Sequence, residues 1–88
     1  TEWLAVHFAK VGIRVNAIAP GDIMTPLTER QLAAAADREA ALREMRSVYP
    51  LGRIGTAEEA ASAICYLASP DAAFITGTIL SIDGGLTA

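Results

Sequence analysis

The sequence predicts an α/β fold in which helices alternate with parallel strands. Residues 13–19 are apolar at nearly every position, as expected of a strand buried on both faces, and they follow a helical stretch at residues 1–10. A second apolar stretch, residues 78–82, follows a clearly marked helix. Two strands joined through a helix lie parallel when the crossover is right-handed. We therefore expect the order helix, strand, helical segment, helix, strand.

The first expected element is a helix over residues 1–10. Leu4, Phe8 and Val11 recur at the i, i+4, i+7 spacing of one helix face. Gly12 is well placed to end the helix, because the position after a helix often takes left-handed backbone. No start signal precedes this helix, so we expect it to begin upstream, and the missing initiator Met agrees with a fragment or a processed chain.

The strand over residues 13–19 is expected to stop at Pro20 and Gly21. Proline has no N–H for the ladder, and glycine lets a ligand approach the backbone closely. In open α/β sheets, ligands bind beyond the carboxyl ends of the strands. This strand end, with Thr25 close behind it, therefore predicts a ligand-facing rim. The alternative is an ordinary strand-to-loop turn.

Residues 25–50 are the least regular part of the sequence. Thr28, or Thr25 itself, is positioned to cap a helix, and Glu39 with Arg43 forms a supporting i, i+4 pair. The many charges and small alanines predict a lightly buried face. The composition favours equally a lid over a ligand site and a plain pair of surface helices.

The last long helix has clear signals at both ends. Thr56 and Glu59 have the spacing of a capping box, and Ser69 precedes a proline that should end the helix. We expect Cys65, the only cysteine, to be a small core residue. The expected buried positions are Ala60, Ala61, Ile64, Cys65, Leu67 and Ala68.

Composition excludes several classes of function. Seven basic residues against ten acidic ones, a net charge of −3, supply no basic face for nucleic acid. No apolar run approaches the ~20 residues of a membrane span, and the first residues do not resemble a signal peptide. A lone cysteine allows no internal disulfide and weakly favours the cytoplasm. The hydrophobic fraction of 52% predicts either faces covered by another part of a protein or simply an alanine-rich helical composition.

Three blocks resemble the short-chain dehydrogenase/reductase family. Residues 12–21 resemble its late strand and Pro-Gly loop, residues 50–59 the start of its last long helix, and residues 76–85 its final strand and C-terminal turn. The blocks are in the family's order and cover nearly the whole chain. The resemblance implies that residues 1–88 are the C-terminal segment of one Rossmann-like doubly wound domain, with residues 25–50 as a substrate-side lid.

The resemblance also implies a function. Such an enzyme transfers a hydride between NAD or NADP and an alcohol or carbonyl substrate. Pro20 and Gly21 would flank the nicotinamide, the Ile23 backbone would bind its carboxamide, and the Thr25 hydroxyl would reach the carboxamide or the pyrophosphate. These contacts orient the cofactor and perform no proton chemistry.

The family's other motifs are absent from this sequence. No three glycines have the Gly-x-x-x-Gly-x-Gly spacing, and the only lysine, Lys10, has Val6 where the family's Tyr-x-x-x-Lys pair needs tyrosine. We therefore assign no catalytic residue and expect no turnover by these 88 residues alone. His7 is expected to be a surface or subunit-contact residue, and with no second histidine we predict no metal site.

A non-catalytic oligomerisation fragment is the alternative function. In the family, the last helix and strand form a subunit interface, so the resemblance implies a homodimer or homotetramer. Three polar residues also have competing roles. Asn16 is expected to tie strand to loop, Arg53 to brace the helix start or bind phosphate, and Asp83 to form a turn or, less simply, to bind a metal.

Overall fold

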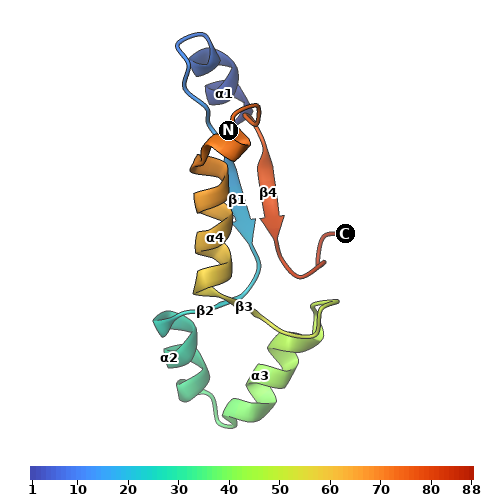
Figure 1. Ribbon diagram of the computed structural model, residues 1–88. Helices are drawn as coiled ribbons and strands as arrows, with labels where there is room; N and C mark the ends of the chain where they lie inside the picture. The colour runs from blue at the N-terminus through green and yellow to red at the C-terminus, as the bar shows by residue number, and fades with distance from the viewer.

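A computed structural model describes all residues, 1–88, and confirms the α/β class. Strands β1 and β4 lie side by side, with α4 along one face and α1 beyond their amino ends (Figure 1). Helices α2 and α3 lie beyond the carboxyl ends, so the chain is elongated, 53 × 25 × 22 Å. The elements are α1 (Glu2–Ala9), β1 (Ala17–Pro20), β2 (Ile23–Met24), α2 (Pro26–Ala34), α3 (Arg38–Ser47), β3 (Gly55–Thr56), α4 (Ala57–Ala68), the 3₁₀ turn η1 (Pro70–Ala72) and β4 (Ile79–Ile82).

Strands β1 and β4 are parallel, as predicted, and their register pairs Pro20 with Ile82. The first strand is shorter at its start than expected, because it begins at Ala17 rather than at residue 13. Directly before this strand, side-chain hydrogen bonds replace the backbone bonds of the sheet. The Asn16 amide donates to the Ile75 carbonyl at 3.0 Å and accepts from the Thr78 N–H at 3.1 Å. Asn16 therefore ties strand to loop, as expected.

Helix α1 ends earlier than predicted and buries a different face. Its C-cap is Lys10, and Gly12, at φ 78°, lies within the turn that follows. The predicted apolar face is exposed, with Phe8 41% and Val11 69% accessible, whereas Ala5 is 2% accessible. Ala5 is small enough to pack closely against the loop before β4, while no element of residues 1–88 covers the larger apolar side chains.

Helix α4 begins at the predicted capping box. The Thr56 hydroxyl accepts from the Glu59 N–H at 3.1 Å, and the Glu59 carboxylate accepts from the Thr56 N–H at 2.9 Å. The same carboxylate receives two 2.8 Å hydrogen bonds from Arg53. Arg53 therefore braces the start of the helix, the first of its two expected roles. The helix ends at Ala68, directly before Ser69 and Pro70, as predicted.

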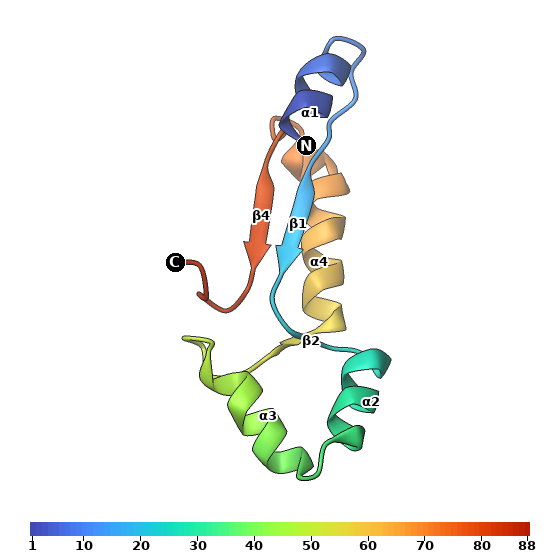
Figure 2. The same ribbon diagram turned by 180° about the vertical axis from the view of Figure 1, so that it is seen from behind.

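The buried face of α4 is narrower than predicted. Only Leu67 is buried, Ala60 and Ala63 are partly covered, and Ile64 is 52% exposed. Cys65 is also exposed, so the expectation that it is a core residue is wrong for this chain. The physical reason is the width of the sheet, since two strands cover one stripe of a helix and leave its flank open (Figure 2).

The segment at residues 25–50 forms two helices, α2 and α3, rather than a single helix that begins at Thr25 or Thr28. Thr25 caps α2 by accepting from the Thr28 N–H at 3.3 Å, and Asp37 caps α3 by accepting from the Ala40 N–H at 3.2 Å. The aspartate offers the new cap, and the extended backbone at Ala35 (ψ 148°) breaks the first helix. Asp37 is the residue in the sequence that marks the start of the second helix.

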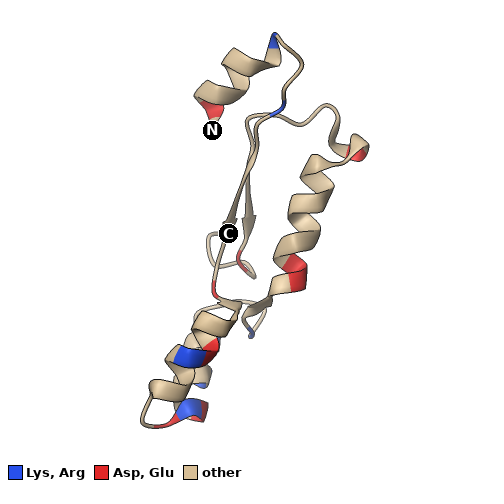
Figure 3. Cartoon of the chain, turned by 90° about the vertical axis from the view of Figure 1, so that its left-hand side faces the viewer, with Lys and Arg blue, Asp and Glu red and all other residues tan.

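An ion pair joins the two helices. The Arg38 guanidinium donates to both oxygens of Glu29 at 3.0 Å, and also reaches Glu39 at 3.5 Å. The expected Glu39–Arg43 pair does not form, because Glu39 lies toward Arg38. Charged residues gather on this helical pair and are sparse along the strands (Figure 3). None of the helices combines the length and apolar character that crossing a membrane requires.

A second parallel pair, β2 with β3, was not predicted. It aligns Ile23 with Gly55 and Met24 with Thr56, and so joins the two ends of the α2–α3 segment. The approach is close, because a Cβ on Gly55 would lie 2.7 Å from the Ile23 Cδ1 atom. Two residues per strand are too few to produce a recognisable sequence pattern.

The Arg53–Glu59 pair predicts an acid-sensitive contribution to stability. The Arg53 guanidinium, with help from the Thr56 N–H, lowers the pKa of Glu59 from 4.5 to about 2. A lowered acid pKa stabilises the fold above pH 4.5, and this contribution is lost as the pH falls towards about 2. In the full-length protein, the denaturant midpoint should therefore fall more steeply with pH below 4.5 than it does in the Glu59→Gln variant. Glutamine at this position keeps the capping box with Thr56 but carries no charge.

Glu58→Gln is the matched control, because Glu58 neighbours Glu59 and makes no ion pair. This variant should follow the acid limb of the unsubstituted protein. If Glu59→Gln followed it as well, the pair would contribute nothing to folding.

Candidate functional site

A cleft of about 290 Å³ lies at the carboxyl ends of β1 and β4. Its lining comes from residues 21–22 after β1, from residues between 49 and 55, from residues 81–85 at the end of β4, and from Glu59 of α4. Parallel strands end at one edge of a sheet, and ligands of α/β proteins bind beyond that edge. The predicted rim is therefore a real concavity, with α2 and α3 extending beyond it (Figure 2).

The four predicted site residues lie on one loop that leaves β1. Gly21 lines the cleft, and Pro20 is the last residue of β1. Ile23 is in β2, and Thr25 is the N-cap of α2. The structure thus brings the four residues to one sheet edge.

The Tyr49 side chain lies against this loop and is 7% exposed. Its hydroxyl accepts from the Asp22 N–H at 2.7 Å and donates to the Asp22 carboxylate at 2.7 Å. The hydrogen bond to that carboxylate raises the pKa of Tyr49, because the anionic acceptor favours the protonated phenol. Tyr49 was not among the predicted site residues, because its only signal in the sequence is an aromatic side chain directly before Pro50.

The open side of Gly21 faces the Tyr49 ring. A Cβ on Gly21 would lie 2.8 Å from Cε1 of that ring, far inside van der Waals contact. From the sequence, the missing Cβ was expected to make room for a ligand. In the structure, the tyrosine ring occupies that space, so glycine is required here by packing within the chain.

Two threonines hold the loop beyond Gly21. The Thr28 hydroxyl donates to the Ile23 carbonyl at 2.7 Å. Its oxygen lies 3.2 Å from the Thr25 hydroxyl, and because the Thr28 proton is already used, Thr25 is the donor in that contact. The Thr25 proton therefore has an alternative partner close by, while its oxygen caps α2.

Asp83 forms the turn at the far wall of the cleft. Its carboxylate accepts from the Thr87 hydroxyl at 2.6 Å and from the Gly85 N–H at 3.2 Å. The Thr87 hydrogen bond is the main reason that the pKa of Asp83 is lowered. The turn is tied to the opposite wall, because the Leu51 N–H donates to the Gly84 carbonyl at 3.1 Å. Asp83 is therefore a turn residue, and no group of three His, Cys, Asp or Glu side chains forms a metal site.

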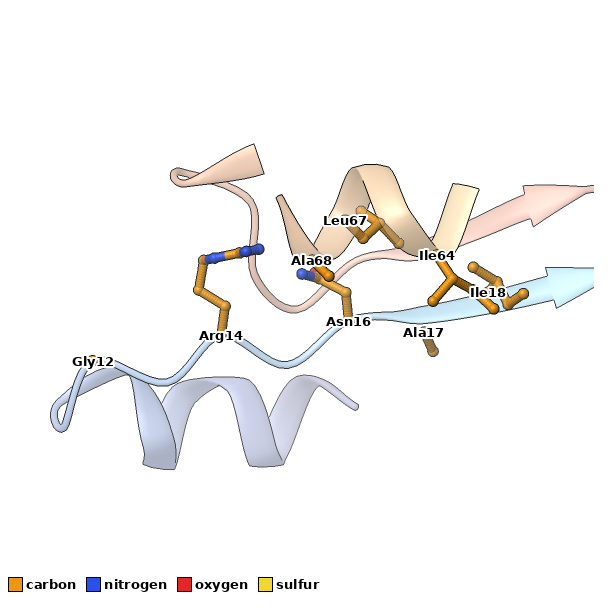
Figure 4. A pocket seen from close by; sticks show the side chains of 8 residues that line it. All are labelled: Gly12, Arg14, Asn16, Ala17, Ile18, Ile64, Leu67 and Ala68. Atoms are coloured by element: carbon orange, nitrogen blue, oxygen red, sulfur yellow. The ribbon is translucent and has the colours of Figure 1, made fainter. Parts of the chain in front are cut away.

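A larger groove, of about 580 Å³, lies between α4 and the chain leading into β1. Its polar side chains, Arg14 and Asn16, point across to the segment after α4, and Ile64 faces Ile18 (Figure 4). Arg14 donates to the Ile75 carbonyl at 3.1 Å and to that of Ser69 at 3.4 Å. The smaller cleft is the candidate ligand site, because it lies beyond the carboxyl ends of the parallel strands.

His7 lies on α1, at the opposite end of the chain from the cleft (Figure 1). Its ring stacks on Trp3 with 3.8 Å between centroids, and Nδ1 lies 2.8 Å from the Trp3 carbonyl oxygen. It is an exposed surface histidine, one of its two predicted roles.

The parallel strands, the covering helix and the cleft at the carboxyl edge define a Rossmann-like α/β protein. A solved short chain dehydrogenase family protein from Francisella tularensis superposes with a TM-score of 0.93 at 34% identity, covering 99% of this chain and 38% of that one. The structure of 4-hydroxyisoleucine dehydrogenase complexed with NADH superposes with a TM-score of 0.86 at 40% identity, and the match covers 99% of this chain and 34% of that one. The structure of ElxO with NADP bound superposes with a TM-score of 0.86 at 40% identity, and the match covers 98% of this chain and 34% of that one.

A family model described as enoyl-(acyl carrier protein) reductase matches residues 1–87. The chain is 45% identical over 87 residues to 3beta-hydroxysteroid dehydrogenase 1 of Eggerthella lenta, covering 99% of this chain and 32% of that protein. It is 46% identical over 86 residues to 3-oxoacyl-(acyl-carrier-protein) reductase of Thermotoga maritima, covering 98% and 32%. The chain belongs to the short-chain dehydrogenase/reductase family, and it spans about a third of the length of these relatives.

The contact of Gly21 with Tyr49 predicts a strongly coupled pair. The φ of Gly21 is not positive, so its backbone admits alanine, and the cost of Gly21→Ala comes from the ring. We expect Gly21→Ala to lower the free energy of unfolding by about 1–3 kcal/mol, as overpacking does. In a Tyr49→Ala background the same change should cost less than about 0.5 kcal/mol, measured as a double-mutant cycle. Additive effects would mean that the ring does not occupy this space.

Proposed function

We propose that this chain is the C-terminal segment of an NAD- or NADP-dependent oxidoreductase that transfers a hydride between the nicotinamide and an alcohol or carbonyl substrate. The observation that carries the proposal is the loop at residues 20–25, which leaves a parallel strand beside a cleft at the sheet's carboxyl edge. Family membership supports it, as do similar structures solved with NADH or NADP.

In this proposal, the loop forms the nicotinamide end of the cofactor site. Pro20 and Gly21 flank the ring, the Ile23 backbone binds the carboxamide, and the Thr25 hydroxyl reaches the carboxamide or the pyrophosphate. Thr25 can change partner at small cost, since its proton leaves Thr28 Oγ1 while its oxygen keeps the helix cap. The proton donor is assigned to an upstream Tyr-x-x-x-Lys pair, because the only lysine here, Lys10, follows Val6 at that spacing.

Residues 25–50 are proposed to be the lid on the substrate side. Helices α2 and α3 extend beyond the carboxyl edge of the sheet (Figure 2), and β2 with β3 joins the two ends of the segment. A segment attached at both ends to a fixed edge can close over a substrate without leaving the fold. We also propose a cytoplasmic setting, on the basis of the single, unpaired cysteine.

Substitution of Thr25 tests the cofactor site. In the full-length protein, Thr25→Val should weaken NAD(H) or NADP(H) binding by about 0.5–1.5 kcal/mol, the net value of one hydrogen bond. Isothermal titration calorimetry measures the dissociation constant. Thr25→Ser is the control, because it keeps both the hydroxyl and the α2 cap, and it should bind like the unsubstituted protein. An unchanged constant for Thr25→Val would remove Thr25 from the site, and no binding by the unsubstituted protein would refute the proposed function.

An association surface is the second candidate function, either within the enzyme or as a non-catalytic oligomerisation fragment. The observation that favours it is an apolar flank of α4, where Ala61, Ile64, Cys65 and Ala68 follow the spacing i, i+3, i+4, i+7 and are exposed. Ile79 of β4 is also 58% exposed. We propose that α4 and β4 meet their copies about a two-fold axis, giving a homodimer or homotetramer.

A charge on this flank tests the association. In a two-fold contact, one introduced carboxylate meets its own copy, and burying like charges together is costly. Ala61→Glu should therefore lower the oligomeric state in light scattering, for example from tetramer to dimer. Ser62→Glu is the matched control, because Ser62 is exposed but lies outside the apolar flank. A monomeric unsubstituted protein would refute the interface.

A further inference from the structure

The structure assigns Tyr49 a positioning role: its hydroxyl fixes the peptide between Gly21 and Asp22, so that the loop presents its backbone to the nicotinamide carboxamide. The inference deepens the proposed function and rests on it. Tyr49 lies outside the loop, directly after α3 and the residue Val48 that caps it. It therefore links the lid segment to the part of the cofactor site that selects the ring orientation.

The hydroxyl bonds to one residue in both directions. It accepts from the Asp22 backbone N–H and donates to the Asp22 carboxylate, each at 2.7 Å. A single rigid phenol therefore restrains the main chain of Asp22 and its side chain at once. On the other side of this residue, the Asp22 carbonyl accepts from the Gly55 N–H at 2.9 Å, so the peptides before and after Asp22 are both held.

The ring is held independently of the hydroxyl. It packs on the Cβ-less face of Gly21, and Gly84 approaches it from the turn after β4, where a Cβ would lie 3.6 Å from the Tyr49 Cβ. Apolar burial of the ring thus anchors the end of α3 to the sheet edge. Removing only the hydroxyl should leave this anchor in place.

Because Asp22 is exposed, the effect of the Tyr49 hydroxyl on nicotinamide binding can be separated from its effect on folding stability. Asp22 is exposed, so water can replace both hydrogen bonds when the hydroxyl is lost, and the fold loses little. Water does not restrain the Gly21–Asp22 peptide, however, so this part of the loop gains conformational freedom that a bound carboxamide must remove. The loss should therefore appear in nicotinamide binding rather than in folding.

The test compares two ligands on the full-length protein. Tyr49→Phe removes the hydroxyl and keeps the ring, and Tyr66→Phe is the control, because Tyr66 is the chain's other tyrosine and lies on the exposed side of α4. Calorimetry gives the dissociation constants of NADH or NADPH and of the matching ADP-ribose, which lacks the nicotinamide. For Tyr49→Phe we expect the reduced cofactor to bind about tenfold more weakly, with the ADP-ribose constant within about twofold. Tyr66→Phe should change neither.

Asp22 variants provide the second line of the test. Asp22→Asn keeps an acceptor for the hydroxyl and should retain most of the affinity for the reduced cofactor. Asp22→Ala keeps only the bond from the backbone N–H, so its affinity should lie between those of the unsubstituted protein and Tyr49→Phe. If Tyr49→Phe fails to fold, the hydroxyl is structural and the inference is wrong. It is also wrong if both ligands weaken equally or neither weakens. If the unsubstituted protein binds neither ligand, the proposed function fails first and the inference fails with it.

Discussion

The parallel pairing of β1 with β4 determines where the proposed cofactor cleft lies. Its register places Pro20 opposite Ile82, so the loop after β1 and the turn after β4 leave the sheet at the same edge. The backbone hydrogen bonds between the two strands end with the one from the Gly21 N–H to the Ile82 carbonyl, at 2.9 Å. Without this pairing, residues separated by some sixty positions in the sequence would not line one cleft.

The segment between the strands is attached to that edge at two places. The short β2–β3 pair joins its ends, and the Tyr49 ring fills the space beside Gly21. At Gly21 a Cβ would overlap the rigid Tyr49 ring, so glycine is required there, whereas at Gly55 it would meet the end of the flexible Ile23 side chain at 2.7 Å. Glycine is used here for close approach rather than for flexibility, and the proposed lid is therefore anchored by packing at both of its ends.

The distribution of apolar surface is the second constraint. Only six of 88 residues are buried, and large apolar side chains such as Trp3 and Phe74 are exposed. Exposed apolar surface on this scale marks contact with other parts of a protein or with other subunits. The relatives agree with this account, because each is about three times the length of this chain. The apolar faces of α1 and α4 are thus explained by contacts that residues 1–88 do not make with one another.

Local signals in the sequence determined the elements whose ends depend on neighbouring residues. Thr56 with Glu59 placed the start of α4, Ser69 before proline placed its end, and the apolar run up to Pro20 placed a parallel strand and its ligand-side end. Each of these depends on capping, on proline or on side-chain pattern within a few residues. The loop carrying the four proposed cofactor contacts was located for the same reason.

Tertiary structure alone decided the features that depend on distant residues. The hydrogen bond from the Tyr49 hydroxyl to Asp22, 27 residues away, was not predictable from the sequence, because it depends on how α3 packs on the sheet edge. Burial on α1 and α4 was overestimated for the same reason, since pattern shows which face is apolar but not whether anything covers it. Local sequence therefore specified where helices and strands begin and end, while the packing of distant segments decided what each residue contacts.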